Sequence, residues 1–431
     1  MGIDRRDSAA LFDSIASFRS ALEATRADGP NVLFITDDSA LEQVLWDGLR
    51  FMASEMPAVC AFVDLGKMAL SPSLLCSAFE FAVTSALRQE DAEATSAPWL
   101  TASVSLGNAA DRLQSRIRGQ LNSAMEALMS AASDSDKTPV LVLRKLTELR
   151  ALKSYKGIDD LFAILGRLFA KFSELRIVVI EKGLSHEAVL EVVGATLGRP
   201  KFGPIMLSSL SEKEVASVAS LVLGTGLSRE DALMLRSLSC GRLSYLLWLC
   251  DQVNRSGASL ERDELVSWVA GALLSPKSDL SCMICSRIEE AISSARGDTA
   301  LRHILRIMSF EDGMTATEIA EKIGRSVPAG YDYANWLLRT LLVRKDDTRY
   351  SFRDHLLKIW IRLDTLACGR AAPVPAELAE TLVLEMLESQ RVEPREEPLE
   401  LLEMVQEEPS LEDEEHIEVF RPRSDDILEF D

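Results

Sequence analysis

The stretch Pro139-Val-Leu-Val-Leu-Arg-Lys-Leu-Thr-Glu-Leu149 decides the fold class of this 431-residue chain. Four consecutive apolar residues, at positions 140–143, are followed by the two cations Arg144 and Lys145. A short continuous apolar run before a polar break is typical of a central strand in a parallel sheet, because helices cover both faces of that strand. Functional side chains in such sheets lie where the strands end. Arg144 and Lys145 are therefore the first candidates for a functional site.

Further apolar runs of strand length lie on both sides of this one in the sequence, and helical patterns separate most of them. The runs cover residues 31–36, 59–63, 175–180 and 204–207. Strands that alternate with helices predict a parallel sheet with helices on both faces. We therefore expect an α/β core over residues 1–206.

After residue 207 the pattern becomes helical, and Ser211 and Ser228 begin capping boxes that open two of the helices. We expect a helical domain over residues 207–298. Residues 299–371 then read as helix, turn, helix and a two-stranded ribbon, which is the order of an α+β winged helix-turn-helix.

Residues 372–431 form an acidic segment with 20 acidic and 4 basic residues, a net charge of −16 out of −20 for the whole chain. Residues 376–390 have the pattern of an amphipathic helix, and we expect the rest of this segment to be mostly disordered. It is either a solubilising segment or a docking segment that orders on binding a partner. It could instead fold back and mask the basic ribbon of the chain. Its partner-binding candidates are Leu378, Leu382, Leu401, Ile427, Leu428 and Phe430.

Composition excludes several classes of protein. No apolar run approaches the ~18–20 residues needed to span a bilayer, and the first residues lack a signal-peptide core. Seven cysteines without a secretion signal fit a reducing cytoplasm. Cys282 and Cys285 have metal-site spacing but sit in an apolar stretch, so we expect buried thiols. The four histidines are scattered, so we expect no metal site and no catalytic triad.

Four segments resemble a known family through their order and spacing along the chain. They are Ala61-Phe-Val-Asp-Leu65, Leu207-Ser-Ser-Leu-Ser-Glu-Lys-Glu214, Ser239-Cys-Gly-Arg-Leu-Ser-Tyr245 and the closing pattern Tyr350-Ser-Phe-Arg-Asp-His-Leu-Leu-Lys-Ile-Trp-Ile-Arg362. The chain resembles the AAA+/STAND group of P-loop ATPases, and within it the archaeal-type ATPase family with a C-terminal winged helix. The resemblance covers about residues 5–366. It implies an AAA+ core, a helical lid and a winged helix.

The chain departs from this family where the family binds and hydrolyses ATP. A P-loop has the pattern Gly-x4-Gly-Lys-Ser/Thr, whose backbone N–H groups and lysine hold the phosphates. Here the first strand is followed by Thr36-Asp-Asp-Ser39, with no glycine and no lysine. Arg144 and Lys145 stand where an acidic pair would hold Mg²⁺ and position water, and Glu181 stands where a polar sensor is expected.

We therefore expect a vestigial cleft without cofactor, built from Thr36, Asp37, Asp38, Ser39, Arg144, Lys145, Glu181 and Lys182. The sheet order of such folds makes the ends of the first, fourth and third strands neighbours. On that basis the three acidic groups, at positions 37, 38 and 181, are predicted to pair with the three cations at positions 144, 145 and 182.

The sequence thus predicts a catalytically inactive ATPase-like protein that works as a scaffold or regulator. Its partner would be a protein, either an active ATPase or the product of a neighbouring gene. One alternative is an atypical active ATPase in which Arg144 and Lys145 replace the charge of Mg²⁺. Another is a DNA-binding regulator that uses the winged helix. The DNA-contact candidates are Arg325, Arg339, Arg344, Lys345 and Arg349.

Overall fold

The three-dimensional structure is a computed structural model. It describes residues 5–15, 18, 31–53, 56–67, 72–88, 110–149, 161–185, 187–189, 191, 202–207, 209–257, 260–293, 295, 297–311, 313–368 and 373–392.

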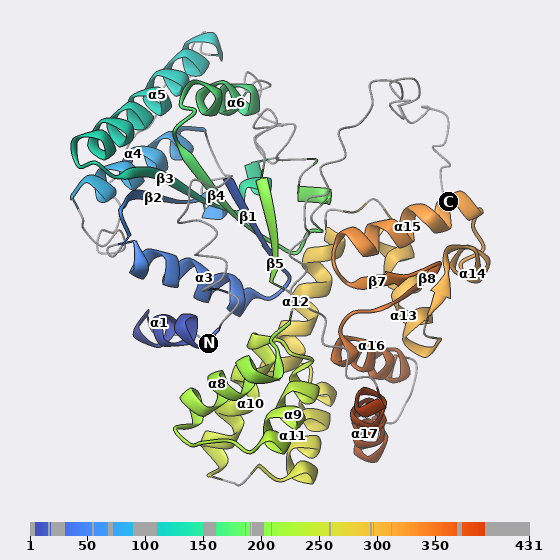
Figure 1. The fold of residues 1–431 in the computed structure, drawn as a ribbon. Coiled ribbons are helices and arrows are strands. Elements are labelled where there is room, and N and C mark those ends of the chain that lie inside the picture. Colours follow the sequence, from blue (N-terminus) through green and yellow to red (C-terminus); the bar gives the residue numbers. More distant parts are fainter. Residues whose placement is uncertain are drawn as a thin grey trace.

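A five-stranded parallel sheet forms the N-terminal half of the structure (Figure 1). Its strands are β1 (Asn31–Thr36), β2 (Ala58–Asp64), β3 (Thr138–Arg144), β4 (Arg176–Lys182) and β5 (Phe202–Leu207). They lie in the order β2-β3-β4-β1-β5. The predicted neighbourhood of the first, fourth and third strands is thereby confirmed, and the carboxyl ends of β3, β4 and β1 lie side by side.

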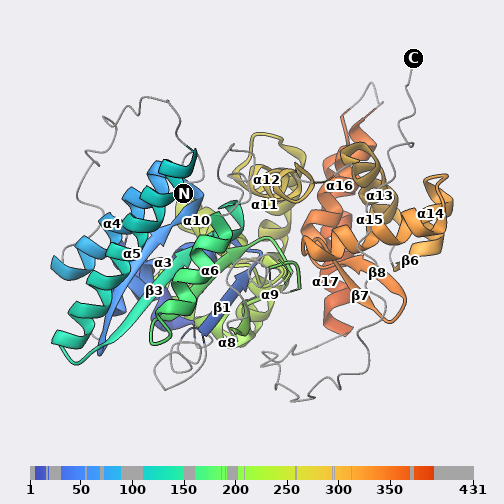
Figure 2. The same cartoon turned by 90° about the horizontal axis from the view of Figure 1, so that it is seen from above.

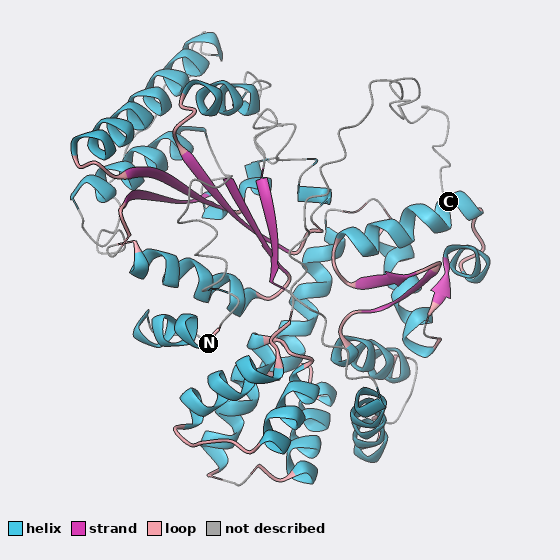
Figure 3. Ribbon diagram, viewed as in Figure 1, coloured by secondary structure: helices cyan, strands magenta, loops and turns pink. Residues whose placement is uncertain are grey.

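Helices cover both faces of the sheet because alternate strand residues point to opposite sides. In β1, Val32 and Phe34 pack in one apolar cluster while Leu33 and Ile35 pack in another. The first cluster includes residues of α1 (Arg5–Ser14) and α3 (Ser39–Met52). The second includes residues of α4 (Pro72–Arg88), α5 (Ala110–Asp134) and α6 (Leu161–Lys171). Figure 3, in which the strands are magenta, shows these two helical layers around the sheet.

Five helices follow the sheet: α8 (Glu212–Leu223), α9 (Arg229–Ser239), α10 (Leu243–Ser256), α11 (Arg262–Leu274) and α12 (Asp279–Ser293). We call these five the lid helices. The capping boxes predicted at Ser211 and Ser228 are confirmed, and each serine side chain accepts a hydrogen bond from the backbone of the third helical residue. The expectation of two buried thiols in α12 was wrong, because Cys282 is exposed and Cys285 is only partly buried.

The next elements are α13 (Asp298–Phe310), β6 (Met314–Thr315), α14 (Ala316–Lys322), α15 (Val327–Arg339), β7 (Val343–Asp346), β8 (Arg349–Phe352) and α16 (His355–Ala367). We call them the helix–ribbon elements. The predicted order of two helices and a ribbon is present, and β6 adds a short third strand in the order β6-β8-β7. In both Figure 1 and Figure 2, α12 lies between the sheet and these elements.

Helix α17 (Ala376–Val392) confirms the predicted helix in the acidic segment, but it belongs to the folded body. It packs against α11 and α16. Leu382 is only 6% exposed and Leu378 is partly buried against the same core. Leu382 therefore packs within the chain and offers little surface to a partner, while Leu378 is partly covered by the same core. The remaining docking candidates, Leu401, Ile427, Leu428 and Phe430, lie outside the described residues.

Helix α5, the longest helix among the described residues, has 25 residues, and six of them are charged. Within the described ranges, no helix combines the length and the apolar character that crossing a membrane requires.

Candidate functional site

Two residues connect the end of β1 to the start of α3, at the carboxyl edge of the sheet. Asp38 is the N-cap of α3, and its carboxylate accepts a hydrogen bond from the backbone N–H of Ala40 at 2.8 Å. The second oxygen of Asp38 accepts from the backbone N–H of Ser244, 3.1 Å away. The Asp38 N–H itself donates to the Thr36 hydroxyl at 3.1 Å. This carboxylate therefore occupies the N-terminus of α3, where a helix would otherwise offer donors to an anion.

The neighbouring carboxylate, Asp37, is held by two arginines that come from the lid helices. Its Oδ2 lies 2.8 Å from Nη1 of Arg242 and 2.5 Å from Nη2 of Arg287. Arg242 also donates to the backbone carbonyl of Asp37. Burial alone would raise the pKa of Asp37, but the charges of Arg242 and then Arg287 outweigh it and lower the pKa from 3.8 to about 2. The aspartate is therefore a charged group at any physiological pH.

Arg287 continues this network to the helix–ribbon elements. Its Nη1 lies 2.7 Å from Oδ2 of Asp354, which also accepts a hydrogen bond from the Tyr245 hydroxyl at 2.9 Å. Asp354 is the N-cap of α16 and accepts from the backbone N–H of Leu357 at 3.1 Å. We name Asp37, Arg242, Tyr245, Arg287 and Asp354 the aspartate–arginine cluster.

Arg144, at the end of β3, has a separate set of partners. Its Nε lies 2.6 Å from the carboxylate of Glu42 in α3, and Nη1 donates to the Gln43 side chain at 3.1 Å. Asp64, at the end of β2, is 3.8 Å from the same guanidinium, which also lies over the ring of Trp46. The arginine thus joins α3 to the two strands beneath it.

Glu181, at the end of β4, is 1% exposed. Its two oxygens accept hydrogen bonds from the backbone N–H and the hydroxyl of Thr147, both at 2.8 Å. Burial raises the pKa of Glu181 from 4.5 to about 7, although both hydrogen bonds from Thr147 oppose that rise. The charges of Glu42 and Glu148 act in the same direction as burial. Glu181 is consequently a carboxyl group that titrates near neutral pH.

Comparison with known proteins adds the fold type. No protein-family model and no curated protein sequence matches the chain. Among solved structures, the Walker-type ATPase PABY2304 of Pyrococcus abyssi is similar over 84% of this chain and 96% of its own, with a TM-score of 0.57 and 13% identity. The chain has the α/β fold of an AAA+-type P-loop ATPase. At this identity the likeness concerns the fold alone.

Two further AAA+-type structures overlap over similar lengths. A RuvB mutant from Thermotoga maritima is similar over 78% of this chain and 90% of its own, with a TM-score of 0.36 and 11% identity. ORC2 of Aeropyrum pernix covers 88% of this chain and 94% of its own, with a TM-score of 0.30 and 12% identity. Both superpositions are too loose to support any inference about this site.

In this AAA+-type fold, the predicted cleft residues gather at one edge of the sheet, but their predicted pairing needs correction. Asp37 pairs with Arg242 and Arg287, and Asp38 caps α3, so neither pairs with Arg144 or Lys145. Lys182 pairs with Glu290 of α12 at 2.7 Å and donates to the Ser39 hydroxyl at 3.0 Å. The backbone N–H of Lys145 donates to the Ile180 carbonyl, which fixes the start of the loop after β3. The prediction failed because it considered only cations on the sheet itself.

Sequence reasoning missed the two arginines and their second carboxylate. Arg242 directly precedes a helix, but nothing in its local sequence indicates a carboxylate partner. Arg287 lies in the middle of an ordinary amphipathic helix, and nothing in its local sequence distinguishes it from a surface arginine. Asp354 has the sequence pattern of a helix cap, which is only half of its role.

Three of the five DNA-contact candidates pair with carboxylates of the chain. Arg339 pairs with Glu191 and so faces the α/β core. Arg344 lies 3.3 Å from Asp346, and Arg349 lies 3.7 Å from Glu318. Arg325 and Lys345 are exposed, and Lys345 lies over the ring of Tyr350. Neighbouring carboxylates therefore offset much of the positive charge.

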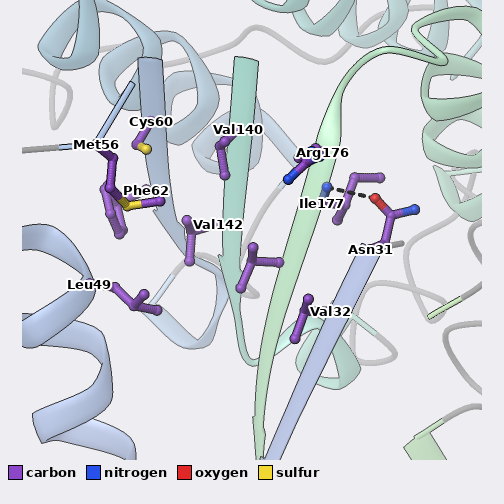
Figure 4. A pocket seen from close by; sticks show the side chains of 11 residues that line it. Asn31, Val32, Leu49, Met56, Cys60, Phe62, Val140, Val142, Arg176 and Ile177 are labelled. Carbon is purple, nitrogen blue, oxygen red and sulfur yellow. Dashed lines mark hydrogen bonds between the residues drawn. The ribbon is translucent and has the colours of Figure 1, made fainter. Parts of the chain in front are cut away.

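An apolar pocket lies at the opposite, amino end of the strands (Figure 4). Val140, Val142, Phe62 and Leu49 point into it, and Asn31 at its rim accepts a hydrogen bond from the Ile177 N–H at 2.9 Å. The pocket encloses about 30 Å³. Sites for small molecules usually measure roughly 300–1,000 Å³, so this pocket is too small to be one. The charged carboxyl edge is the better candidate site.

Proposed function

We propose that this chain is an AAA+-type protein without ATP hydrolysis that acts as a scaffold or regulator through protein contacts. The observation that carries the proposal is the buried Asp37 carboxylate between Arg242 and Arg287, at the place where a P-loop would begin. A phosphate group at this point would have to break both ion pairs. It would also face two carboxylates, and like charges about 4 Å apart in a partly dry cleft repel by several kcal/mol.

The ends of the neighbouring strands support the same proposal. Mg²⁺ needs carboxylate or other oxygen ligands beside the phosphates. Arg144 takes the place of such a ligand, and it is committed to Glu42 rather than free to neutralise a phosphate. Glu181 is committed to Thr147. This arrangement speaks against the atypical active ATPase, because that enzyme would require Arg144 to face the nucleotide.

The partner-binding part of the proposal concerns residues 393–431. This segment contains 16 acidic and 3 basic residues, with Leu401, Ile427, Leu428 and Phe430 among its apolar positions. Apolar residues within acidic sequence are typical of segments that order on binding a protein. A chain ended at residue 392 keeps α17, and it should lose the partner that the full chain retains in a pull-down. Equal recovery of that partner by both chains would remove the segment from the proposal.

A winged helix that binds DNA is the second candidate, because α14, α15 and the β7–β8 ribbon have the order of that motif. The exposed face of α15 favours a protein contact instead. Val327 and Tyr331 are 43% and 48% exposed there, and Asp332 lies beside them. Binding of duplex DNA that weakens steeply with salt, and that is lost on changing Arg325 and Lys345 to glutamine, would favour the DNA-binding alternative.

Calorimetric titration of the full chain with ATP and ADP, with and without Mg²⁺, tests the central proposal. We expect no binding at millimolar nucleotide, because the buried ion pairs and the capped helix leave no phosphate site. Binding in the micromolar range would refute the proposal. An assay of nucleotide turnover, followed by the same assay on Arg144→Ala, would then show whether this arginine acts on the nucleotide.

A further inference from the structure

The aspartate–arginine cluster joins parts of the chain that are far apart in sequence. Asp37 follows β1, Arg242 and Tyr245 lie at the start of α10, Arg287 lies in α12, and Asp354 begins α16. The two residues of the Asp37–Arg287 contact are 250 positions apart in the sequence. The cluster is therefore the point where the sheet, the lid helices and the helix–ribbon elements meet.

We propose that this cluster is a built-in joint that holds the three parts in one arrangement, with the Asp37 carboxylate in the place of a bound anion between the two arginines. The inference rests on the proposed function, since it assumes that no nucleotide enters the cleft. It extends that function because the Asp37 carboxylate, rather than a nucleotide phosphate, would hold the two arginines in place. The arrangement of the parts would then be independent of nucleotide.

The geometry is that of a closed circuit of alternating charges. Arg287 bridges the two carboxylates, at 2.5 Å from Asp37 and 2.7 Å from Asp354. Arg242 also lies between the two carboxylates, at 2.8 Å from Asp37 and 3.8 Å from Asp354. The four side chains are between 2% and 11% exposed and together carry no net charge. Removal of any one member would leave an unbalanced buried charge.

The cluster fits a role in specifying an arrangement better than a role in maximising stability. Within the described residues, Oδ1 of Asp37 and Nε of both arginines have no hydrogen-bond partner. Buried charges that are incompletely paired contribute little net stability, and apolar residues of similar size often stabilise a core more. Directional bonds between distant segments do, however, define one relative position of those segments.

Contacts beside the cluster connect the same parts. The Asp38 carboxylate accepts from Ser244 of α10, and Lys182 of β4 pairs with Glu290 of α12. Arg287 donates to the carbonyl of Leu341, just after α15, at 3.1 Å. The backbone N–H of Ser185, just after β4, donates to the carbonyl of Arg339 at 2.6 Å. The joint thus extends from α10 along the carboxyl edge of the sheet to α15.

Hydrogen–deuterium exchange on the full chain and on Asp37→Ala tests the inference. The variant keeps two arginines against one carboxylate, so we expect amide exchange at the starts of α10 and α16 and within α12 to accelerate by at least about a hundredfold. Formate at 0.1 M, compared with chloride, should restore protection by binding between the arginines. Glu289→Ala is the matched control, because it removes an exposed carboxylate from the same helix α12.

Unchanged exchange at these three segments would overturn the joint. Faster exchange that formate does not reverse would overturn the claim that the carboxylate stands in for an anion. If Asp37→Ala does not fold, Asp354→Asn provides the test, since asparagine still caps α16 but removes the charge. That variant should accelerate exchange in α12 and at the start of α16, and failure to do so would also overturn the joint.

Exchange of the unaltered chain with and without millimolar Mg·ATP separates the two proposals. Loosened variants together with a nucleotide-protected cleft in the unaltered chain would refute the proposed function, and with it the claim that the Asp37 carboxylate stands in for a bound anion, while the cluster would still hold the three parts together. No effect of nucleotide together with unchanged variants would leave the proposed function standing and refute the joint.

Discussion

A neutral glutamine at position 181 is expected to stabilise this protein at pH 8. Glu181 is 1% exposed, and burial raises its pKa from 4.5 to about 7. Because the folded-state pKa lies above the unfolded one, the stability from binding a proton is fully present below pH 4.5 and is lost as the pH rises through 7. Each pKa unit corresponds to ~1.4 kcal/mol, so the charged form is penalised by roughly 3 kcal/mol at pH 8.

Glutamine can keep both contacts with Thr147. Its carbonyl accepts from the Thr147 N–H, and its amide donates to the hydroxyl oxygen. We therefore expect the free energy of unfolding of Glu181→Gln to exceed that of the unaltered chain by about 1–3 kcal/mol at pH 8, and by little or nothing at pH 4.5. Urea unfolding followed by circular dichroism at both pH values measures the difference.

Glu126→Gln is the control for this measurement. Glu126 is an exposed carboxylate whose pKa is lowered, mainly by its hydrogen bond with Lys171, so its replacement should not stabilise the chain as the pH rises. If Glu181→Gln changes stability equally at pH 4.5 and pH 8, or destabilises at pH 8, then burial does not raise the pKa of Glu181 in the folded protein. The hydrogen bonds from Thr147 would then dominate.

Two substitutions test the packing of the helix–ribbon elements and of α17. In Gly330→Ala, the added Cβ would lie 2.5 Å from the Ala316 carbonyl oxygen and 2.7 Å from the Cβ of Ala320. We therefore expect the free energy of unfolding, measured with urea, to fall by about 1–3 kcal/mol. Gly271→Ala, where nothing lies within 4 Å of the new Cβ, should instead raise the free energy of unfolding by about 0.5–1 kcal/mol. Equal effects of the two substitutions would contradict the expected clash at position 330. Leu382→Ala should lower the free energy of unfolding by about 2–5 kcal/mol, because this α17 side chain is buried against the core. Glu385 is exposed on the same helix, and Glu385→Ala should leave stability nearly unchanged. A Leu382→Ala variant as stable as the unaltered chain would contradict the packing of α17 as part of the folded body.

The sheet was predictable because its signals are local. Each strand is a short apolar run, and β3 is buried at six of its seven positions, as a strand covered on both faces must be. The neighbourhood of the third, fourth and first strands followed from the fold type once these runs were found. The polar residues at the strand ends were located correctly for the same reason, since a chain position fixes which end of a parallel strand a residue occupies.

The partners of these polar residues were not predictable, because they come from helices far away in the sequence. Arg287 reaches Asp37 only through the packing of α12 against the sheet edge. Helix α17 gives the same lesson. Its apolar positions at Leu378, Leu382 and Met386 predict a helix with one apolar face, but such a face does not specify what it packs against. The acidic composition around it suggested an external partner, whereas the face belongs to the chain's own core.

The two reversals of charge at the cleft, at Arg144 and at Asp37, have separate partners in the structure. Arg144 is neutralised within the sheet layer by Glu42 and Asp64, while Asp37 is neutralised by arginines from the lid helices. Changing either residue alone to the type expected in an ATPase would leave its own buried partners unbalanced. Only two residues separate β1 from α3, which is too few for a phosphate-binding loop. A P-loop type of phosphate site at this edge would therefore need an inserted loop as well as both substitutions, and each substitution alone would leave buried charges unbalanced.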